Sequence, residues 1–232
     1  MKQYSLLFIF LCSVLQFYAQ NEEVTVVSDS LYKEDQFYIA ATYNFLGNKP
    51  NDLSQSGFSS GFHLGFIKDM PINKRRNVAI GLGIGLSSNA FNQNMLIDKD
   101  VTGIYQYSIL SEENTAYTKN KFVMYLIDVP LEFRWRTSTT TQYKFWRIYS
   151  GLKFSYVLAN TSKFKGGTGQ KKFTNIQDFN NFQYGLTLSA GYNTWNLHLY
   201  YALNPIFSNS ARINGNAINM NAIKIGLIFY IL

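Results

Sequence analysis

The sequence has one cysteine, two histidines and four prolines in 232 residues, and only 15% of its residues are charged. A single cysteine excludes a disulfide scaffold and a cysteine-based zinc site. The low charge, with 19 phenylalanines and 17 tyrosines, excludes a disordered chain. After the first 20 residues, no apolar run reaches the roughly 18 residues that a membrane-spanning helix requires. The chain must therefore accommodate many aromatic rings without a long apolar segment.

Residues 1–19 have the composition of a secretory signal peptide, with Lys2 before an apolar stretch and Ala19 at a plausible cleavage position. A lipoprotein signal acylated at Cys12 is the competing interpretation, but Leu11 directly before it is larger than such a signal requires. We expect export, a periplasmic N-terminal segment over 20–35, and a membrane domain over 36–232.

The rest of the chain alternates between apolar and small or polar residues, which is the period of a β-strand. The clearest example is 78–87, where Val78, Ile80, Leu82, Ile84 and Leu86 share one face. The same pattern predicts eight strands, over about 37–45, 58–66, 78–87, 123–135, 146–158, 182–193, 195–204 and 223–231.

The connections between these segments alternate strictly in length. The long ones cover about 47–56, 89–121, 159–181 and 208–218, and the short ones 69–77, 137–143 and 193–194. Short periplasmic turns and longer outer loops are typical of transmembrane β-barrels, and aromatic residues cluster toward the strand ends as at membrane interfaces. The sequence therefore predicts an all-β fold, an eight-stranded antiparallel transmembrane β-barrel in the outer membrane.

A soluble barrel or sandwich with its apolar faces turned inward is the alternative. Its outer face would need Lys, Glu and Thr for solubility, whereas the second face here is Gly, Ser, Ala and Asn. Residues 224–231 also fit loosely the final-strand signal of outer-membrane barrels, although the usual terminal aromatic residue is absent.

Alternation places a set of charged residues in the lumen. We expect a structural charge network there, in which Asp128 and Glu132 face cations from several strands; its members are Asp128, Glu132, Arg134, Arg147, Lys153 and Lys224. Arg136, Tyr149, Tyr230, His63 and His198 are also predicted to point inward. A path for ions or a binding pocket is the alternative use of these residues.

Pro130 lies in the middle of the fourth predicted strand. Proline cannot donate a ladder hydrogen bond, and a closed barrel has no free edge, so we expect a bulge or kink there.

Motifs for chemistry are weak. The glycines of 81–85 lie within a strand pattern, and 166–171 lacks the ending of a phosphate-binding loop. No catalytic, cofactor-binding or metal-binding residue is predicted, no cofactor is expected, and we expect a protein that is not an enzyme.

Basic residues concentrate in two places, at 74–76 in a short turn and at Lys163, Lys165, Lys171 and Lys172 in a long connection. Outer-membrane lipid and lipopolysaccharide phosphates are the expected counter-charges, and nucleic acid is not an expected partner. A merely solvated loop explains the lysines equally well.

Residues 125–136 (YLIDVPLEFRWR) and 144–151 (KFWRIYSG) resemble the PorT-like outer-membrane β-barrel proteins of Bacteroidota. The strand motif includes Asp128, Pro130 and Leu131. The resemblance implies an eight-stranded outer-membrane barrel and, for some members, a role in type IX protein secretion and gliding.

Two classes of function therefore remain open: an accessory or assembly component of a secretion complex, and a general small barrel for envelope integrity, adhesion or narrow-solute passage. Residues 89–121 are unusually apolar for a free loop, which indicates a partner, such as another secretion or outer-membrane complex protein, or a β-extension above the membrane.

Overall fold

The computed structural model describes residues 35–111, 116–137, 145–167 and 169–231. The predicted signal peptide, and nearly all of the segment predicted to follow it, lie outside these residues. Within the described part, no helix is long and apolar enough to cross a membrane.

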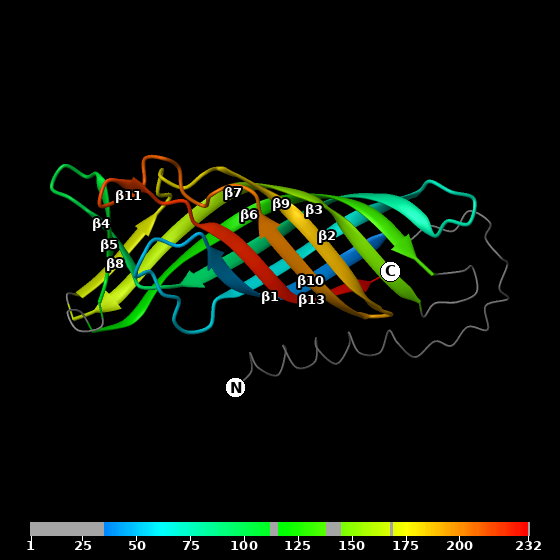
Figure 1. The fold of residues 1–232 in the computed structure, drawn as a ribbon, viewed down its shortest axis with the longest axis horizontal. Helices are drawn as coiled ribbons and strands as arrows, with labels where there is room; N and C mark the ends of the chain where they lie inside the picture. Colours follow the sequence, from blue (N-terminus) through cyan, green and yellow to red (C-terminus); the bar gives the residue numbers. More distant parts are fainter. Residues whose placement is uncertain (1–34, 112–115, 138–144, 168, 232) are drawn as a thin grey trace, which may run out of the picture. The chain divides into compact units, whose positions relative to one another are not determined.

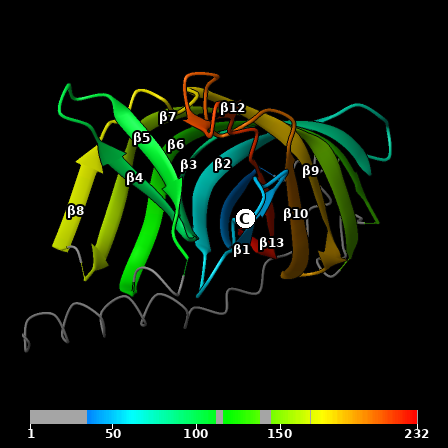
Figure 2. The same cartoon turned by 60° about the vertical axis from the view of Figure 1, so that its left-hand side comes forward.

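Eight antiparallel strands form a closed ring (Figures 1 and 2). In ring order they are β1 (Gln36–Gly47), β2 (Ser60–Pro71), β3 (Val78–Asn92), β6 (Tyr117–Arg136), β7 (Trp146–Gly166), β9 (Phe182–Tyr192), β10 (Trp195–Ala202) and β13 (Asn221–Ile231). The first and last strands close the ring, since Phe37 pairs with Ile231 and Gly47 with Asn221. The predicted eight-stranded antiparallel barrel is confirmed.

The two ends of the barrel differ. At the end that we call the turn end, short connections follow β2, β6 and β9, and Gln36 and Ile231 lie there. The tightest turn is formed by Asn193 and Thr194, where Asn193 has a φ of 54°, a left-handed conformation that asparagine tolerates. The opposite end, which carries the long connections, is called the loop end.

The long connections contain more β-structure than the sequence predicted. The strands β4 (Met95–Lys99) and β5 (Tyr105–Ile109) form a hairpin, as do β11 (Arg212–Ile213) and β12 (Asn216–Ala217), while β8 (Gly169–Thr174) pairs with the end of β7. Both β6 and β7 also continue well past their predicted limits at the loop end (Figure 1). The expected loops over 89–121 and 159–181 are thus partly strands, because their apolar residues pack against one another above the barrel wall.

Side chains alternate around the ring in the sense that a membrane requires. On β9, Phe182 is 69% exposed and Leu186 50%, whereas their neighbours Gln183 and Thr187 are 4% and 7% exposed. Apolar side chains therefore face outward and polar ones inward, which is the reverse of a soluble barrel.

Aromatic residues pair on the outer face near both ends of the strands. Near the turn end, the ring centroids of Trp146 and Tyr192 are 5.4 Å apart and those of Trp195 and Phe229 are 5.2 Å apart. Toward the loop end, Tyr156 and Phe182 pair at 5.2 Å. These two belts mark the membrane interfaces, as the sequence predicted.

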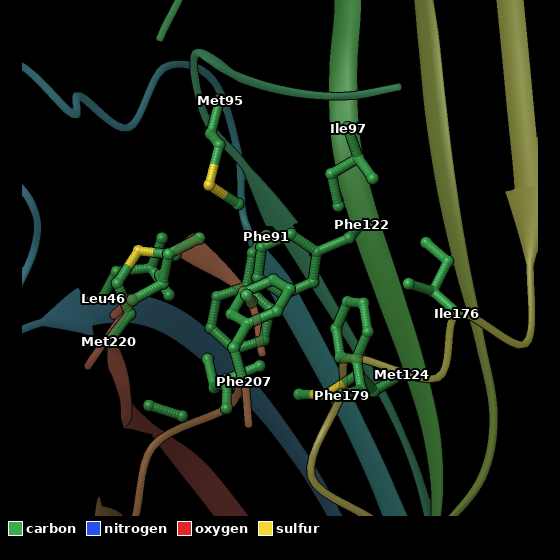
Figure 3. Close-up of a cluster of buried hydrophobic side chains, with 14 of the residues drawn as sticks. Leu46, Phe91, Met95, Ile97, Phe122, Met124, Ile176, Phe179, Phe207 and Met220 are labelled. Carbon is green, nitrogen blue, oxygen red and sulfur yellow. The ribbon is translucent and has the colours of Figure 1, made fainter. Parts of the chain in front are cut away.

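The lumen toward the loop end is apolar, which the sequence did not predict. Phe122 stacks on Phe91 at 5.0 Å and meets the edge of Phe207 at 5.6 Å (Figure 3). Loop residues fold into the same cluster, whose described members include Leu46, Met95, Ile97, Met124, Ile176, Phe179, Ile206, Ile218 and Met220. The expected small, polar lumen is therefore found only toward the turn end.

We predicted a bulge or kink at Pro130, and the strand register shows no β-bulge there. The pairing of β3 with β6 lacks its two pairs at Gly83 and Ile84, but Leu82–Leu131 and Gly85–Asp128 keep one register on either side. Gly83 leaves room for the proline ring, since a Cβ built there would lie 3.1 Å from Pro130 Cγ. A missing side chain accommodates the proline, so the strand needs no extra residue.

Candidate functional site

All six members of the predicted charge network are buried in the lumen, none more than 5% exposed: Asp128, Glu132, Arg134, Arg147, Lys153 and Lys224. Arg136, Tyr149, Tyr230, His63 and His198 are buried beside them. Period-two strands position these side chains, since every second residue of a barrel strand points inward. In the strand motif Asp128, Pro130 and Leu131, the side chain of Leu131 points outward and is 41% exposed.

The first group of charges lies near the turn end and centres on Asp69. The Asp69 carboxylate accepts hydrogen bonds from Arg136 Nη1 and Nη2 at 2.9 and 2.8 Å, and from Arg134 Nη1 at 3.0 Å. Arg134 also donates from Nε to Glu132 at 3.2 Å and from Nη2 to Gln36 at 2.8 Å. Strands β1, β2 and β6 are thereby joined across the lumen by charge-assisted bonds.

Asp69 and Gln36 were missed by the sequence analysis, which placed Asp69 at the start of a turn. The sequence nevertheless contains a signal for Asp69, because Asp69 and His63 are separated by an even number of residues on one strand and so point to the same side. Extending the predicted second strand from residue 66 to the end of β2 would have placed Asp69 in the lumen.

The second group of charges centres on Asp128. Its Oδ1 accepts a hydrogen bond of 2.6 Å from Ser155, and its Oδ2 lies 3.8 Å from Lys153 Nζ and 3.8 Å from His63 Nδ1. His63 Nε2 lies 3.3 Å from the Thr42 hydroxyl. Asp128 and Lys153 are thus brought together, as are Glu132 and Arg134 in the first group.

Three cations of the lumen lie over aromatic rings. Lys153 and Lys224 both hold their Nζ atoms 4.7 Å from the centroid of Tyr200. The Arg147 guanidinium lies 4.5 Å from the centroid of Phe145. In the described part of the chain, neither Arg147 nor Lys224 has a carboxylate within 4 Å, so cation–π contacts take the place of the expected ion pairs.

Little space remains among these side chains. A cavity of about 20 Å³ is lined by residues that include Tyr38, His63, Lys153 and His198. That volume admits about one water molecule. Together with the apolar cluster above it, the charge network closes the lumen within the described residues.

The loop end carries a much larger open cleft, of about 1020 Å³. Its walls are residues 48–54, the end of β5 and the β11–β12 hairpin. Five lining asparagines make no side-chain hydrogen bond within the described part of the chain: Asn48, Asn51, Asn214, Asn216 and Asn219. One lysine and one aspartate, Lys49 and Asp52, also line the cleft, so its wall is polar and nearly neutral.

Polar contacts hold the segments around the cleft in place. Tyr107 on β5 donates a hydrogen bond of 2.8 Å to Asp178, which also accepts one of 2.7 Å from Ser210. Burial and the Asp178 carboxylate raise the pKa of Tyr107 well above its ordinary value, so the phenol stays protonated and donates. Asn94 joins the two sides of the cleft by donating to the backbone oxygens of Asp52 and Leu110.

Among the described residues, no three His, Cys, Asp or Glu side chains lie close enough together to hold a metal ion.

An eight-stranded ring with an apolar outer face, two aromatic belts and a charged interior defines a transmembrane β-barrel of the outer membrane. The chain belongs to the family described as the outer membrane protein beta-barrel domain, which matches residues 18–208. In such barrels short turns face the periplasm, so the loop end faces outward.

Two solved structures are similar to this chain. One is Ail, the attachment invasion locus protein of Yersinia pestis, at 10% identity and a TM-score of 0.34. The other is Ail in complex with the heparin analogue sucrose octasulfate, at 11% identity and a TM-score of 0.35. Each comparison covers 87% of this chain and 100% of the other. No curated protein matches the chain.

Proposed function

We propose that this protein is a non-enzymatic accessory component of an outer-membrane assembly, which acts through its outer surface and not through its lumen. The observation that carries the proposal is the closed lumen below an open cleft. The carboxylates of Asp69, Asp128 and Glu132 all face cations, and a cavity of about 20 Å³ gives no room for a solute. A binding role therefore falls to the loop end.

The asparagine-lined cleft is the docking site in this proposal. Its side-chain amides, unpaired within the described residues, offer both donors and acceptors, and its near-neutral wall suits a polar, uncharged segment of a partner. Hydrogen bonds to such a partner would replace bonds to water, so they would supply specificity more than affinity.

Type IX protein secretion and the linked gliding machinery are the process that we propose for this assembly. The support is the resemblance of residues 125–136 and 144–151 to PorT-like barrels of Bacteroidota. The alternative is a general barrel for envelope integrity or adhesion. Narrow-solute passage, the third function considered for a general barrel, is disfavoured because the lumen is filled.

Deleting the gene and measuring secretion of type IX cargo tests the proposal. We expect a secretion defect that wild-type protein restores. The double variant Asn216→Arg/Asn219→Arg should fold but fail to restore secretion, because two long cations then occupy the cleft. Asn209→Arg, exposed at the same end but outside the cleft, is the matched control and should restore it.

Normal secretion in the deletion strain would overturn the secretion role. Increased sensitivity to detergents in that strain would then favour the envelope-integrity alternative. Full restoration by the cleft variant would overturn the cleft as the docking site.

A further inference from the structure

Strands β6, β7 and β8 extend together at the loop end (Figure 1). Five lysines lie on the outer face of these strands. Lys121 pairs with Lys163 and Lys119 with Lys165 between β6 and β7, and Lys163 also pairs with Lys172 between β7 and β8. Directly paired residues project from the same face of a sheet. These five residues are called the lysine face.

A β-bulge in β7 produces this arrangement. The register of β6 and β7 shifts beside Tyr125 and leaves Leu158 without a partner on β6. An extra residue exchanges the two faces of a strand, so Lys163 and Lys165 point outward while Phe164 is buried inside. Without the bulge, the strand would direct these two lysines into the apolar cluster.

The described residues supply no counter-charge to the lysine face. Like charges directly opposite each other destabilise a sheet. Within the described residues, no carboxylate lies within 4 Å of any of the five. The contrast is Lys171, which projects from the inner face of β8 and forms an ion pair with Asp98 of β4. Among the residues that the structure describes, the inward lysine has a carboxylate partner and the five outward lysines have none.

The position of these lysines relative to the membrane follows from the strand geometry. Tyr125, 46% exposed in the outer aromatic belt, lies four residues from Lys121 on the same face of β6. Four residues of strand span about 13 Å, or about 10 Å along the membrane normal for a strand tilted by about 40°. This height is that of the headgroups, and flexible lysine side chains can extend back toward them.

We propose that the lysine face binds the phosphate groups of anionic lipids in the outer leaflet, with lipid A as the expected ligand. Lysine binds phosphate as a compact point charge, and basic residues near an anionic membrane surface attract it. The lysines lie directly above lipid-facing side chains, so the lipid that packs against Tyr125 and Tyr156 can place its phosphates beside them. The proposal rests on the outer-membrane location and not on the secretion role, so either can fail without the other.

The test titrates the full purified chain, in a zwitterionic detergent, with diphosphorylated lipid A and follows bound lipid by native mass spectrometry. Each Lys→Gln change in the lysine face should weaken binding about fivefold at low salt. The variant Lys119→Gln/Lys121→Gln/Lys163→Gln/Lys165→Gln/Lys172→Gln should lose binding. Heat-modifiable migration in gels shows that each variant remains folded.

The chain offers matched controls. Lys171→Gln removes a charge from the same strand as Lys172→Gln but from its other face, and should leave lipid binding unchanged. The turn variant Lys74→Gln/Arg75→Gln/Arg76→Gln removes three cations from the turn end and should also bind normally. Lipid A without phosphates should bind the wild type as weakly as the lysine variants bind the intact lipid.

Equal binding of lipid A by the wild type and the five-lysine variant would overturn the proposal, as would an equal loss in the turn variant. Inorganic phosphate that competes as well as lipid A, at equal phosphate concentration, would identify a free-phosphate site and overturn the assignment to lipid.

Discussion

Arg136 and Asp69 face each other inside the barrel through two parallel hydrogen bonds, Nη1 to Oδ1 at 2.9 Å and Nη2 to Oδ2 at 2.8 Å. Both side chains are fully buried, and Arg134 binds the same carboxylate. One aspartate of β2 thus bridges two guanidiniums of β6, and Glu132 supplies a second carboxylate to Arg134. Asp69 is the carboxylate that both guanidiniums share.

Asp69→Asn should therefore lower the free energy of unfolding by about 3–5 kcal/mol, because it removes the charge of a buried carboxylate that both guanidiniums contact. Urea titration of the folded, heat-modifiable form in lipid vesicles measures the change. Asp52→Asn, at an exposed position of the loop end, should have almost no effect. Equal stability of the two variants would contradict this account.

Replacing Tyr200 separates ring chemistry from packing. The Nζ atoms of Lys153 and Lys224 both lie over this ring, so Tyr200→Phe should retain most of the stability. Tyr200→Leu should cost about 2 kcal/mol more than the Phe variant, because both buried ammonium groups lose the ring. The same urea titration gives both values; a leucine variant as stable as the phenylalanine variant would show that the contacts contribute nothing.

The closed lumen predicts that the wild-type protein forms no stable conductance in planar bilayers. The charge groups fill one half of the lumen and the apolar cluster around Phe122 and Phe207 closes the other. A porin in the same bilayers is the positive control for insertion and recording. Steady, large openings of the wild type would refute the closed lumen.

The ion pair of Asp98 with Lys171 predicts a pH dependence confined to the loop end. Burial opposes ionisation of Asp98, but the hydrogen bonds from Lys171 and from the Lys99 amide, together with the charge of Lys171, outweigh burial and lower the pKa of the carboxyl. The stabilisation is therefore present above the ordinary aspartate pKa of about 3.9 and is lost as pH falls through the lowered value. After correction for the pH dependence of intrinsic exchange, the protection factors of the β4–β5 amides should fall over that range.

Asp98→Asn should remove this acid response and cost less than about 1 kcal/mol at neutral pH, because the pair is partly exposed. An acid response of the β4–β5 amides that persists in the variant would assign the effect to another group.

The eight barrel strands could be predicted from the sequence because lipid and lumen impose opposite demands on successive residues. Val78–Asn92 shows this most clearly, with exposed Leu82, Ile84 and Leu86 between buried Gly81, Gly85 and Ser87. The inward positions of Asp128, Glu132 and Arg134 followed from the same parity. Period two is a local property, so one sequence suffices to detect it.

The loop end could not be predicted in the same way, because its order depends on contacts between distant segments. Phe122 packs against Phe207, which belongs to a different loop, and Asp178 orients Tyr107. The bulge at Leu158 exchanges the inward and outward positions in the second half of β7, and no residue type in the sequence indicates it. Lys163 and Lys165 therefore point outward, although continuing the parity of the first half of β7 would direct them into the lumen.

The unequal strand lengths give the barrel a direction within the plane of the membrane. With 20 and 21 residues, β6 and β7 stand above the 8 to 11 residues of β9, β10 and β13. A neighbouring protein on the β6–β7 side contacts strands that extend well beyond the membrane surface, whereas one on the β10–β13 side contacts strands that end lower. Contacts above the membrane surface therefore differ around the circumference, and a lateral partner can distinguish one rotational setting of this barrel from another.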